Sequence, residues 1–202
     1  MARGIQFFLK RVFDFVTSAV LLVILSPLFL LIALSIRLSS SGPVLYEWNV
    51  VGKNGKPFKG HKFRTMVQNA DELKAMLLDR NEMRGPVFKL KDDPRVTPVG
   101  RVLRKFSLDE LPQLWSVLKG DMSLVGPRPE RPHFVKKHKA LHELRLAVKP
   151  GLTGLAQIRS FYDLKPQHKI RYDYLYIQKR SLLLNLYILL RTIPAVFSRK
   201  GW

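Results

Sequence analysis

The longest apolar run of the chain lies near its start. Residues 15–36 include no charged side chain, and a run of this length predicts a membrane helix. Ser26-Pro27 interrupts the run at its middle. Proline removes one backbone hydrogen bond and clashes with the preceding turn, so we expect a kink there, with the Ser26 hydroxyl bonding a freed carbonyl. Each half is then roughly 17 Å long, about half of a bilayer core.

Basic residues flank this run on both sides, with Lys10 and Arg11 before it and Arg37 and Lys53 after it. A spanning helix is oriented by an asymmetry of Lys and Arg, and none is evident here. Two topologies therefore stay open: a re-entrant helix that returns to the side it entered, and a Pro-kinked single span. The run exceeds a usual signal-peptide core, which disfavours cleavage.

The rest of the chain alternates short strand and helix patterns. Residues 44–51 and 57–66 predict a β-hairpin whose turn contains Asn54-Gly55. Apolar spacing predicts an amphipathic helix over about 69–83. We further expect helices over three segments, which are about 98–104, 131–148 and 182–197. The last is too short to span a membrane and carries basic and aromatic residues, which favours an interfacial helix, although a core helix is the alternative.

Composition limits the partners and the chemistry. The 202 residues include 35 Lys and Arg against 15 Asp and Glu, a formal net charge of +20. Such a surface attracts anions, which include nucleic acid, anionic membranes and phosphorylated small molecules. The chain has no cysteine, which excludes disulfides, thiolate metal sites and cysteine nucleophiles.

Two adjacent carboxylates, Asp109 and Glu110, stand out in this basic chain. The spacing of Ser107 and Glu110 fits a capping box, in which Glu110 would only secure a helix start. Because Pro112 disturbs that reading, the helix could instead start near Asp109. A helix N-terminus would favour ionised Asp109 and attract phosphate. An ionised aspartate beside a phosphate suits covalent phosphoryl transfer and Mg²⁺ binding. Capping and catalysis both stay open.

Arginines and lysines near the pair are candidate phosphate ligands. Arg128 stands between two prolines, and its planar guanidinium fits phosphate oxygens. Arg104, Lys62 and Arg64 are further candidates, although a solvated surface charge is the alternative for each. His138 and His142 have the spacing of a zinc pair, but no third ligand is evident, which disfavours a metal site there.

These motifs resemble the bacterial sugar transferase family, the small monotopic polyprenol-phosphate phosphoglycosyl transferases. The resemblance covers almost the whole chain. It rests on segments in a fixed order, which are residues 10–14, Ser26-Pro27, 62–66, 93–97, 107–113, 119–129 and 149–154. The chain departs from the family at Leu155, where tryptophan is frequent, and at Asn185, where aspartate is frequent.

The resemblance implies transfer of a phosphosugar from a UDP-sugar to polyprenol (undecaprenyl) phosphate, which yields UMP and starts cell-surface glycan assembly. It implies a ping-pong mechanism in which Asp109 attacks the β-phosphorus. Glu110 would help to hold Mg²⁺ together with Asp109, and Arg128 and Arg104 would hold phosphate. It also implies the minimal catalytic form of the family.

We therefore predict an α/β, predominantly helical protein with two parts. Residues 1–38 form a re-entrant membrane anchor, and residues 39–202 form a compact catalytic domain with a small hairpin and amphipathic interfacial helices. The expected location is the cytoplasmic face of the bacterial inner membrane, in contact with anionic lipids, with a homodimer as the further assembly and no nucleic-acid partner. A membrane-anchored basic nucleic-acid-binding protein is the alternative.

Overall fold

The computed structural model of the protein describes residues 2–82, 88, 90, 92–137, 139–159 and 166–197. Most of this part is helical, with a small antiparallel hairpin, as predicted. The helices are α1 (Ala2–Ile24), α2 (Ser26–Ser39), α3 (Ala70–Met76), α4 (Pro98–Lys105), α5 (Leu114–Lys119), α6 (Pro132–Lys137), α7 (Lys139–Leu146), α8 (Leu155–Arg159), α9 (Pro166–Lys179) and α10 (Leu182–Phe197). The strands are β1 (Leu45–Val51), β2 (Pro57–Phe63), β3 (Ser123–Val125) and β4 (Gly151–Thr153), and the 3₁₀ turns are η1 (Lys53–Gly55), η2 (Leu78–Arg80) and η3 (Leu108–Gln113).

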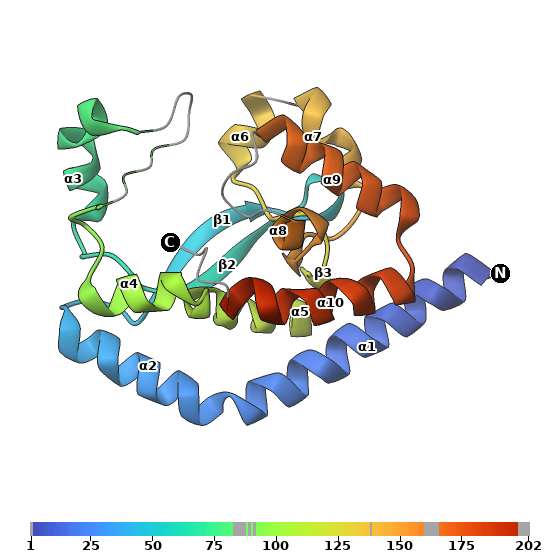
Figure 1. The fold of residues 1–202 in the computed structure, drawn as a ribbon, viewed down its shortest axis with the longest axis horizontal. Coiled ribbons are helices and arrows are strands. Elements are labelled where there is room, and N and C mark those ends of the chain that lie inside the picture. The colour runs from blue at the N-terminus through green and yellow to red at the C-terminus, as the bar shows by residue number, and fades with distance from the viewer. Residues whose placement is uncertain are drawn as a thin grey trace.

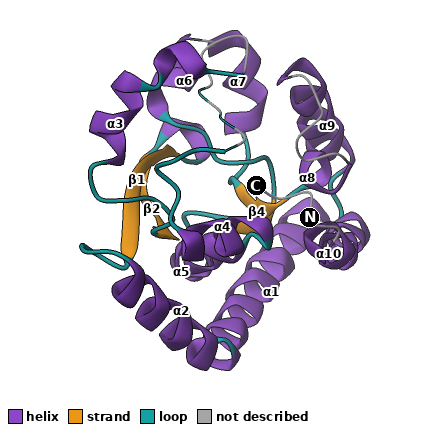
Figure 2. Ribbon diagram, turned by 60° about the vertical axis from the view of Figure 1, so that its left-hand side comes forward, coloured by secondary structure: helices purple, strands orange, loops and turns teal. Residues whose placement is uncertain are grey.

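The elements lie in three levels (Figure 1). The bent pair α1–α2 lies beneath, a row that includes α4, α5 and α10 follows, and the hairpin and α6, α7 and α9 lie above. A rotated view shows α4 and α5 above the bent pair and beside the hairpin (Figure 2). The carboxylate pair lies between α4 and α5 in the sequence, so it is held in the middle level.

The predicted helix break is present. The bend between α1 and α2 is 59°, and the Ser26 hydroxyl donates to the Val23 carbonyl over 2.7 Å. Pro27 stands in the first turn of α2, where its missing N–H costs little. No single described helix is long and apolar enough to cross a membrane, whereas the bent pair meets that standard when taken together.

The hairpin forms as predicted, with β1 and β2 antiparallel. Asn54 and Gly55 have positive φ values of 58° and 77°, which explains why Asn-Gly occupies this turn. Tyr46 pairs with Lys62, and Trp48 pairs with Gly60. One face of the hairpin therefore carries Lys62 toward η3, against which β2 packs.

Two predicted helices differ in length. The helix expected over 69–83 ends at Met76, and η2 follows. None of its described side chains is buried, so little tertiary packing extends it. The basic helix expected over 131–148 forms as α6 and α7, with residue 138 outside the described residues.

A buried core holds the middle and upper levels together. Its fully buried members include Leu114, Val117, Met122 and Ile188, from α5, the loop after it and α10. Both departures from the family pattern lie inside the fold. Leu155 is part of this core, and buried Asn185 accepts a hydrogen bond from the Tyr176 hydroxyl over 2.9 Å.

Candidate active site

Asp109 and Glu110 lie on the 3₁₀ turn η3, between α4 and α5. Ser107 precedes the turn in the left-handed region, with φ 52°, and its side chain caps no backbone N–H. Pro112 lies inside the turn. The capping-box interpretation was therefore wrong, because Ser107 and Pro112 do not allow a regular helix start here. Glu110 is not a helix cap, because its carboxylate binds the side chains of Lys62 and Arg128.

Glu110 forms ion pairs with Lys62 and Arg128, two of the predicted phosphate ligands. Lys62 Nζ lies 2.8 Å from Glu110 Oε1, and the Arg128 guanidinium contacts both oxygens, at 2.5 and 3.2 Å. The Glu110 side chain is only 15% exposed. Burial alone would raise the pKa of Glu110, but the charges of Arg128 and Lys62 outweigh it and lower that pKa. Glu110 is therefore an ionised anchor that fixes the positions of two cations.

Asp109 has the opposite electrostatic state. Burial raises its pKa to about 6, and the charge of Glu110 adds to this, while Lys62, Arg104 and Arg128 oppose it. The expectation that a helix N-terminus would favour the ionised form was wrong, because η3 is a short turn and burial dominates. The Asp109 carboxylate makes no hydrogen bond or ion pair with the described residues. It is thus an open carboxylate, in the sense that no described residue bonds it, and the charges of Lys62, Arg104 and Arg128 act on it.

The other two predicted phosphate ligands have different positions. Arg104 lies near the pair: its charge acts on Asp109, and its Nε donates to the Thr65 hydroxyl over 2.9 Å. Arg64 is turned toward the end of α2, where its Nη2 donates to the carbonyl and the hydroxyl of Ser40 at 2.8 and 3.0 Å. The structure brings together Lys62, Arg104, Arg128 and the two carboxylates, and it places Arg64 outside that group.

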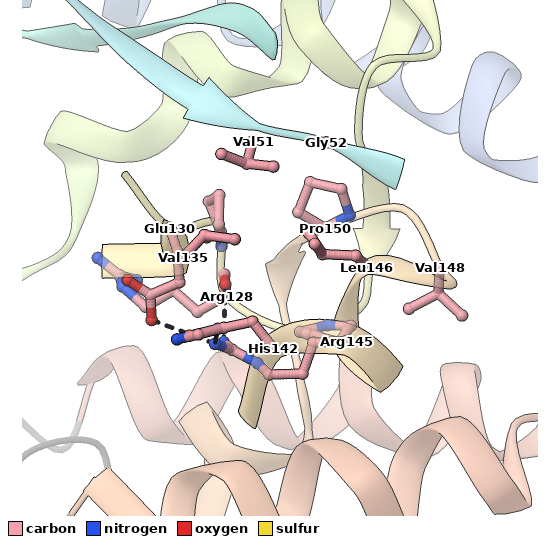
Figure 3. A pocket seen from close by; sticks show the side chains of 12 residues that line it. Val51, Gly52, Arg128, Glu130, Val135, His142, Arg145, Leu146, Val148 and Pro150 are labelled. Carbon is pink, nitrogen blue, oxygen red and sulfur yellow. Dashed lines mark hydrogen bonds and ion pairs between the residues drawn. The ribbon is translucent and has the colours of Figure 1, made fainter. Parts of the chain in front are cut away.

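Arg145 holds the backbone of the Pro-Arg-Pro segment. The sequence did not indicate this role for Arg145. Its Nη2 donates to the Arg128 carbonyl over 3.0 Å, and its Nη1 lies 2.8 Å from His142 Nδ1. Its Nε lies 2.8 Å from Asp173 Oδ2 on α9, and Glu130 Oε1 is 3.4 Å from Nη1. Figure 3 shows Arg128, Glu130, His142 and Arg145 beside a cavity of about 20 Å³, which has room for about one water. His142 therefore partners Arg145.

We predict that Arg145→Met destabilises the fold by about 3–5 kcal/mol, because it leaves Asp173 buried without its cation. Asp173 is 3% exposed, and burial raises its pKa to about 6 although Arg145 opposes the rise. Urea unfolding in detergent micelles would measure the loss. The double variant Arg145→Met, Asp173→Asn removes the unpaired charge and should recover part of it. A single variant as stable as the wild type would contradict the prediction.

A magnesium ion was predicted on both carboxylates. Among the described residues, no group of three or more His, Cys, Asp or Glu converges on one point. Mg²⁺ needs only one or two protein carboxylates when substrate phosphates supply further oxygens. Asp109 fits such a site because its carboxylate is open. Glu110 fits it poorly, since Arg128 and Lys62 bind its oxygens.

Comparison with known proteins gives this arrangement a context. The family model described as bacterial sugar transferase matches residues 5–199. The exopolysaccharide production protein ExoY of Sinorhizobium fredii is 43% identical over 196 residues, which cover 95% of this chain and 87% of that protein. The undecaprenyl-phosphate galactose phosphotransferase of Salmonella typhimurium is 40% identical over 205 residues. The UDP-glucose:undecaprenyl-phosphate glucose-1-phosphate transferase of Klebsiella pneumoniae is 38% identical over 208 residues.

Coverage differs between these relatives. The chain is matched over its full length by the Salmonella protein and over 98% by the Klebsiella protein, but these matches take in only 43% and 42% of those longer proteins. The family match, over residues 5–199, includes η3, the Pro-Arg-Pro segment and nearly all of the bent helix pair. On this match and these identities, the protein belongs to the bacterial sugar transferase family.

Proposed function

We propose that the protein transfers a phosphosugar from a UDP-sugar to undecaprenyl phosphate, an early step in the assembly of a cell-surface polysaccharide. The observation that carries the proposal is the open Asp109 carboxylate beside Glu110, which clamps Lys62 and Arg128. Such a site presents a nucleophile to an electrophilic phosphorus and supplies cations for the charge that develops on its oxygens. The names of the Salmonella and Klebsiella relatives, both of which include undecaprenyl phosphate, support the same acceptor.

The proposed reaction has two displacements at phosphorus. An Asp109 carboxylate oxygen forms a bond to the β-phosphorus, the bond from that phosphorus to the bridging oxygen breaks, and UMP leaves with the electron pair. A phosphate oxygen of the lipid then attacks the phosphosugar-aspartate. The new diphosphate bond forms as the aspartyl bond breaks, which restores the Asp109 carboxylate. Neither step requires a net proton transfer.

The surrounding residues have distinct roles in this proposal. Lys62 and Arg128 stabilise the charge on the phosphoryl oxygens, and Glu110 holds both cations in place. Arg104 adds a third cation near Asp109. Mg²⁺, with Asp109 as its protein ligand, would neutralise part of the diphosphate charge.

We also propose that the bent helix pair is a re-entrant anchor, which would place the site at the cytoplasmic face of the membrane. The first half of α1 (Ala2–Ile24) is fixed to the catalytic part, because Arg11 donates to the carbonyls of Val117 and Leu118 at 2.8 Å each. The end of α2 is fixed to the same part, because Ile36 packs in one cluster with Phe63. Contact of both helices of the pair with one compact body supports a path that returns to the side from which it starts.

The side chains near the bend support this membrane anchor. Val23, Ile24, Leu30 and Leu31 are between 62% and 74% exposed. Exposed apolar surface of this extent marks a membrane or protein interaction site, and at the bend of this pair it supports the membrane anchor. The end of α10 carries exposed apolar residues too, including Phe197, which suits an interfacial helix on anionic lipids. Arg199 and Lys200, the basic residues beyond it, lie outside the described residues.

We predict that single labels placed before Phe15 and after Arg37 react from the same side of a sealed vesicle. Cysteine labelling suits this experiment because the chain has no native cysteine. A membrane-impermeant reagent added to inverted vesicles should modify both sites to a similar extent. A third label at Asp121, whose side chain is 36% exposed, reports the side on which the catalytic domain lies and serves as a control. Modification of the first two labels from opposite sides of the membrane would instead support a Pro-kinked helix that spans the membrane once.

The proposed reaction is tested by incubating the purified protein with undecaprenyl phosphate and a panel of UDP-sugars. UMP release with at least one sugar, dependent on Mg²⁺, is the expected result. No release with any sugar, together with salt-sensitive binding of DNA or RNA, would instead favour the nucleic-acid-binding alternative. The panel also identifies the sugar.

A further inference from the structure

A second and larger hollow lies between β1 and the segment that enters α6, two elements that lie next to each other in Figure 1. Its volume is about 470 Å³. Tyr46, Trp48 and Asn49 of β1 line one side, and Arg131, His133 and Lys136 line the other. The proposed phosphoryl transfer uses none of these residues. We call this hollow the β1–α6 groove.

The indole of Trp48 is held in place by an unusual neighbour. Its cross-strand partner is Gly60, and a Cβ atom at Gly60 would lie only 2.5 Å from Trp48 Nε1. Gly60 has no positive φ, so its lack of a side chain is a matter of space. The glycine therefore allows the indole to lie across the neighbouring strand, which gives the groove a flat aromatic wall.

This wall is joined directly to the candidate active site. Lys62 Nζ lies 5.0 Å from the centre of the Trp48 ring and 2.8 Å from Glu110 Oε1. The Lys62 side chain therefore contacts both the Trp48 ring and Glu110. A ligand that stacks on Trp48 would lie close to the carboxylate pair, with the Lys62 ammonium group between them. That separation suits the base and the reacting phosphorus of one nucleoside diphosphate, with the ribose and the α-phosphate between them.

The charge of the groove favours an anion. Lys59, Arg131 and Lys136 line it, and the Arg131 guanidinium lies 5.9 Å from the centre of the Trp48 ring. The carboxylate that lines it, Glu47, lies 3.6 Å from His61. A hexose is uncharged and needs no such cations. A nucleotide offers both a flat ring that stacks on an indole and a phosphate that binds Arg and Lys.

We infer that the β1–α6 groove binds the uridine monophosphate part of the donor, with the base against Trp48 and the α-phosphate near Lys62 and Arg131. This inference rests on the proposed function, because it assigns the position of the leaving group. It implies that the sugar extends away from Trp48 and that UMP affinity and sugar choice depend on different residues.

Calorimetric titration of UMP into the detergent-purified protein tests the inference. Trp48→Ala should weaken UMP binding about tenfold, and Trp48→Phe should retain most of it, because a phenyl ring still stacks. Gly60→Ala should also weaken UMP, since its Cβ displaces the indole. Arg131→Ala should weaken UMP but leave uridine unchanged. Trp115→Ala removes an indole that is 50% exposed on α5, outside the groove, and should bind UMP as the wild type does.

Steady-state kinetics separates this inference from the proposed function. Trp48→Ala should raise KM for the UDP-sugar about tenfold with little change in kcat. If Trp48→Ala binds UMP as tightly as the wild type, the inference is wrong even when the enzyme is active. A changed preference among UDP-sugars at unchanged UMP affinity would assign the groove to the sugar and overturn it as well. Failure of the proposed function appears differently, as a wild type that releases no UMP from any donor.

Discussion

Asp109→Asn is expected to reduce turnover by at least about 10⁴-fold, because an amide does not replace a carboxylate as nucleophile at phosphorus. The substitution keeps the size of the side chain. It also removes a charge that burial disfavours, since the pKa of Asp109 is raised to about 6. No hydrogen bond or ion pair with the described residues is lost. The variant should therefore fold and insert in the membrane normally.

Two measurements separate the loss of the nucleophile from general damage. The first is UMP release in the presence of undecaprenyl phosphate. The second is trapping of a donor labelled in its β-phosphate when the lipid is omitted: the wild type should retain label on the protein, and Asp109→Asn should retain none. Asp121→Asn makes the same substitution at a surface carboxylate that is 36% exposed, and it should stay within about twofold of the wild type. A labelled or fully active Asp109→Asn would exclude the covalent mechanism.

The hairpin and the helix break were predictable because their signals are local. Asn54-Gly55 suits the positive φ values of its turn, and Ser26-Pro27 disrupts any helix in which it stands. The end of α5 is local too: Gly120 adopts φ 95° after its last residue, as a left-handed helix end requires. Glycine, asparagine and proline restrict or permit particular backbone conformations at their own positions. Turns and helix ends at these residues can therefore be predicted from the sequence before the tertiary structure is known.

The site itself was only partly predictable, because its pairings are long-range. Glu110 meets Lys62 from 48 residues upstream and Arg128 from 18 residues downstream. The residue types indicated a phosphate site, but no spacing rule indicated that Glu110 binds these cations itself. Arg145 was missed for the same reason, since its partners come from several segments that only the fold brings together.

The electrostatic state of Asp109 was predicted in the wrong direction. The sequence suggested a helix N-terminus, which would lower its pKa. The structure replaces that helix with a 3₁₀ turn and buries the carboxylate next to a second one, and both effects raise the pKa. Burial depends on the whole fold. The sequence around Asp109 therefore indicated the candidate nucleophile but could not indicate its pKa.

This ionisation leads to a distinct expectation for Glu110→Gln. In the wild type, Asp109 must be ionised to attack, so the rate should fall as the pH falls through about 6. Glutamine removes the negative charge next to Asp109 and releases Lys62 and Arg128 from their anchor. Both changes favour ionised Asp109, so the acidic limb of the pH–rate profile should move to lower pH. The Arg128 side chain is 37% exposed, so water can solvate it and the fold should persist.

The maximal rate of Glu110→Gln should nevertheless fall about 10²-fold, because a neutral amide holds the two cations less firmly where charge develops on the phosphoryl oxygens. Lys62→Met is the matched variant. It also lowers the rate, but it removes a positive charge that lowers the pKa of Asp109, so its acidic limb should move to higher pH. UMP release measured between pH 4.5 and pH 8, a range of about 1.5 units or more on each side of about 6, resolves both shifts. Limbs that move in the same direction, or do not move, would show that Glu110 and Lys62 do not set the charge of Asp109.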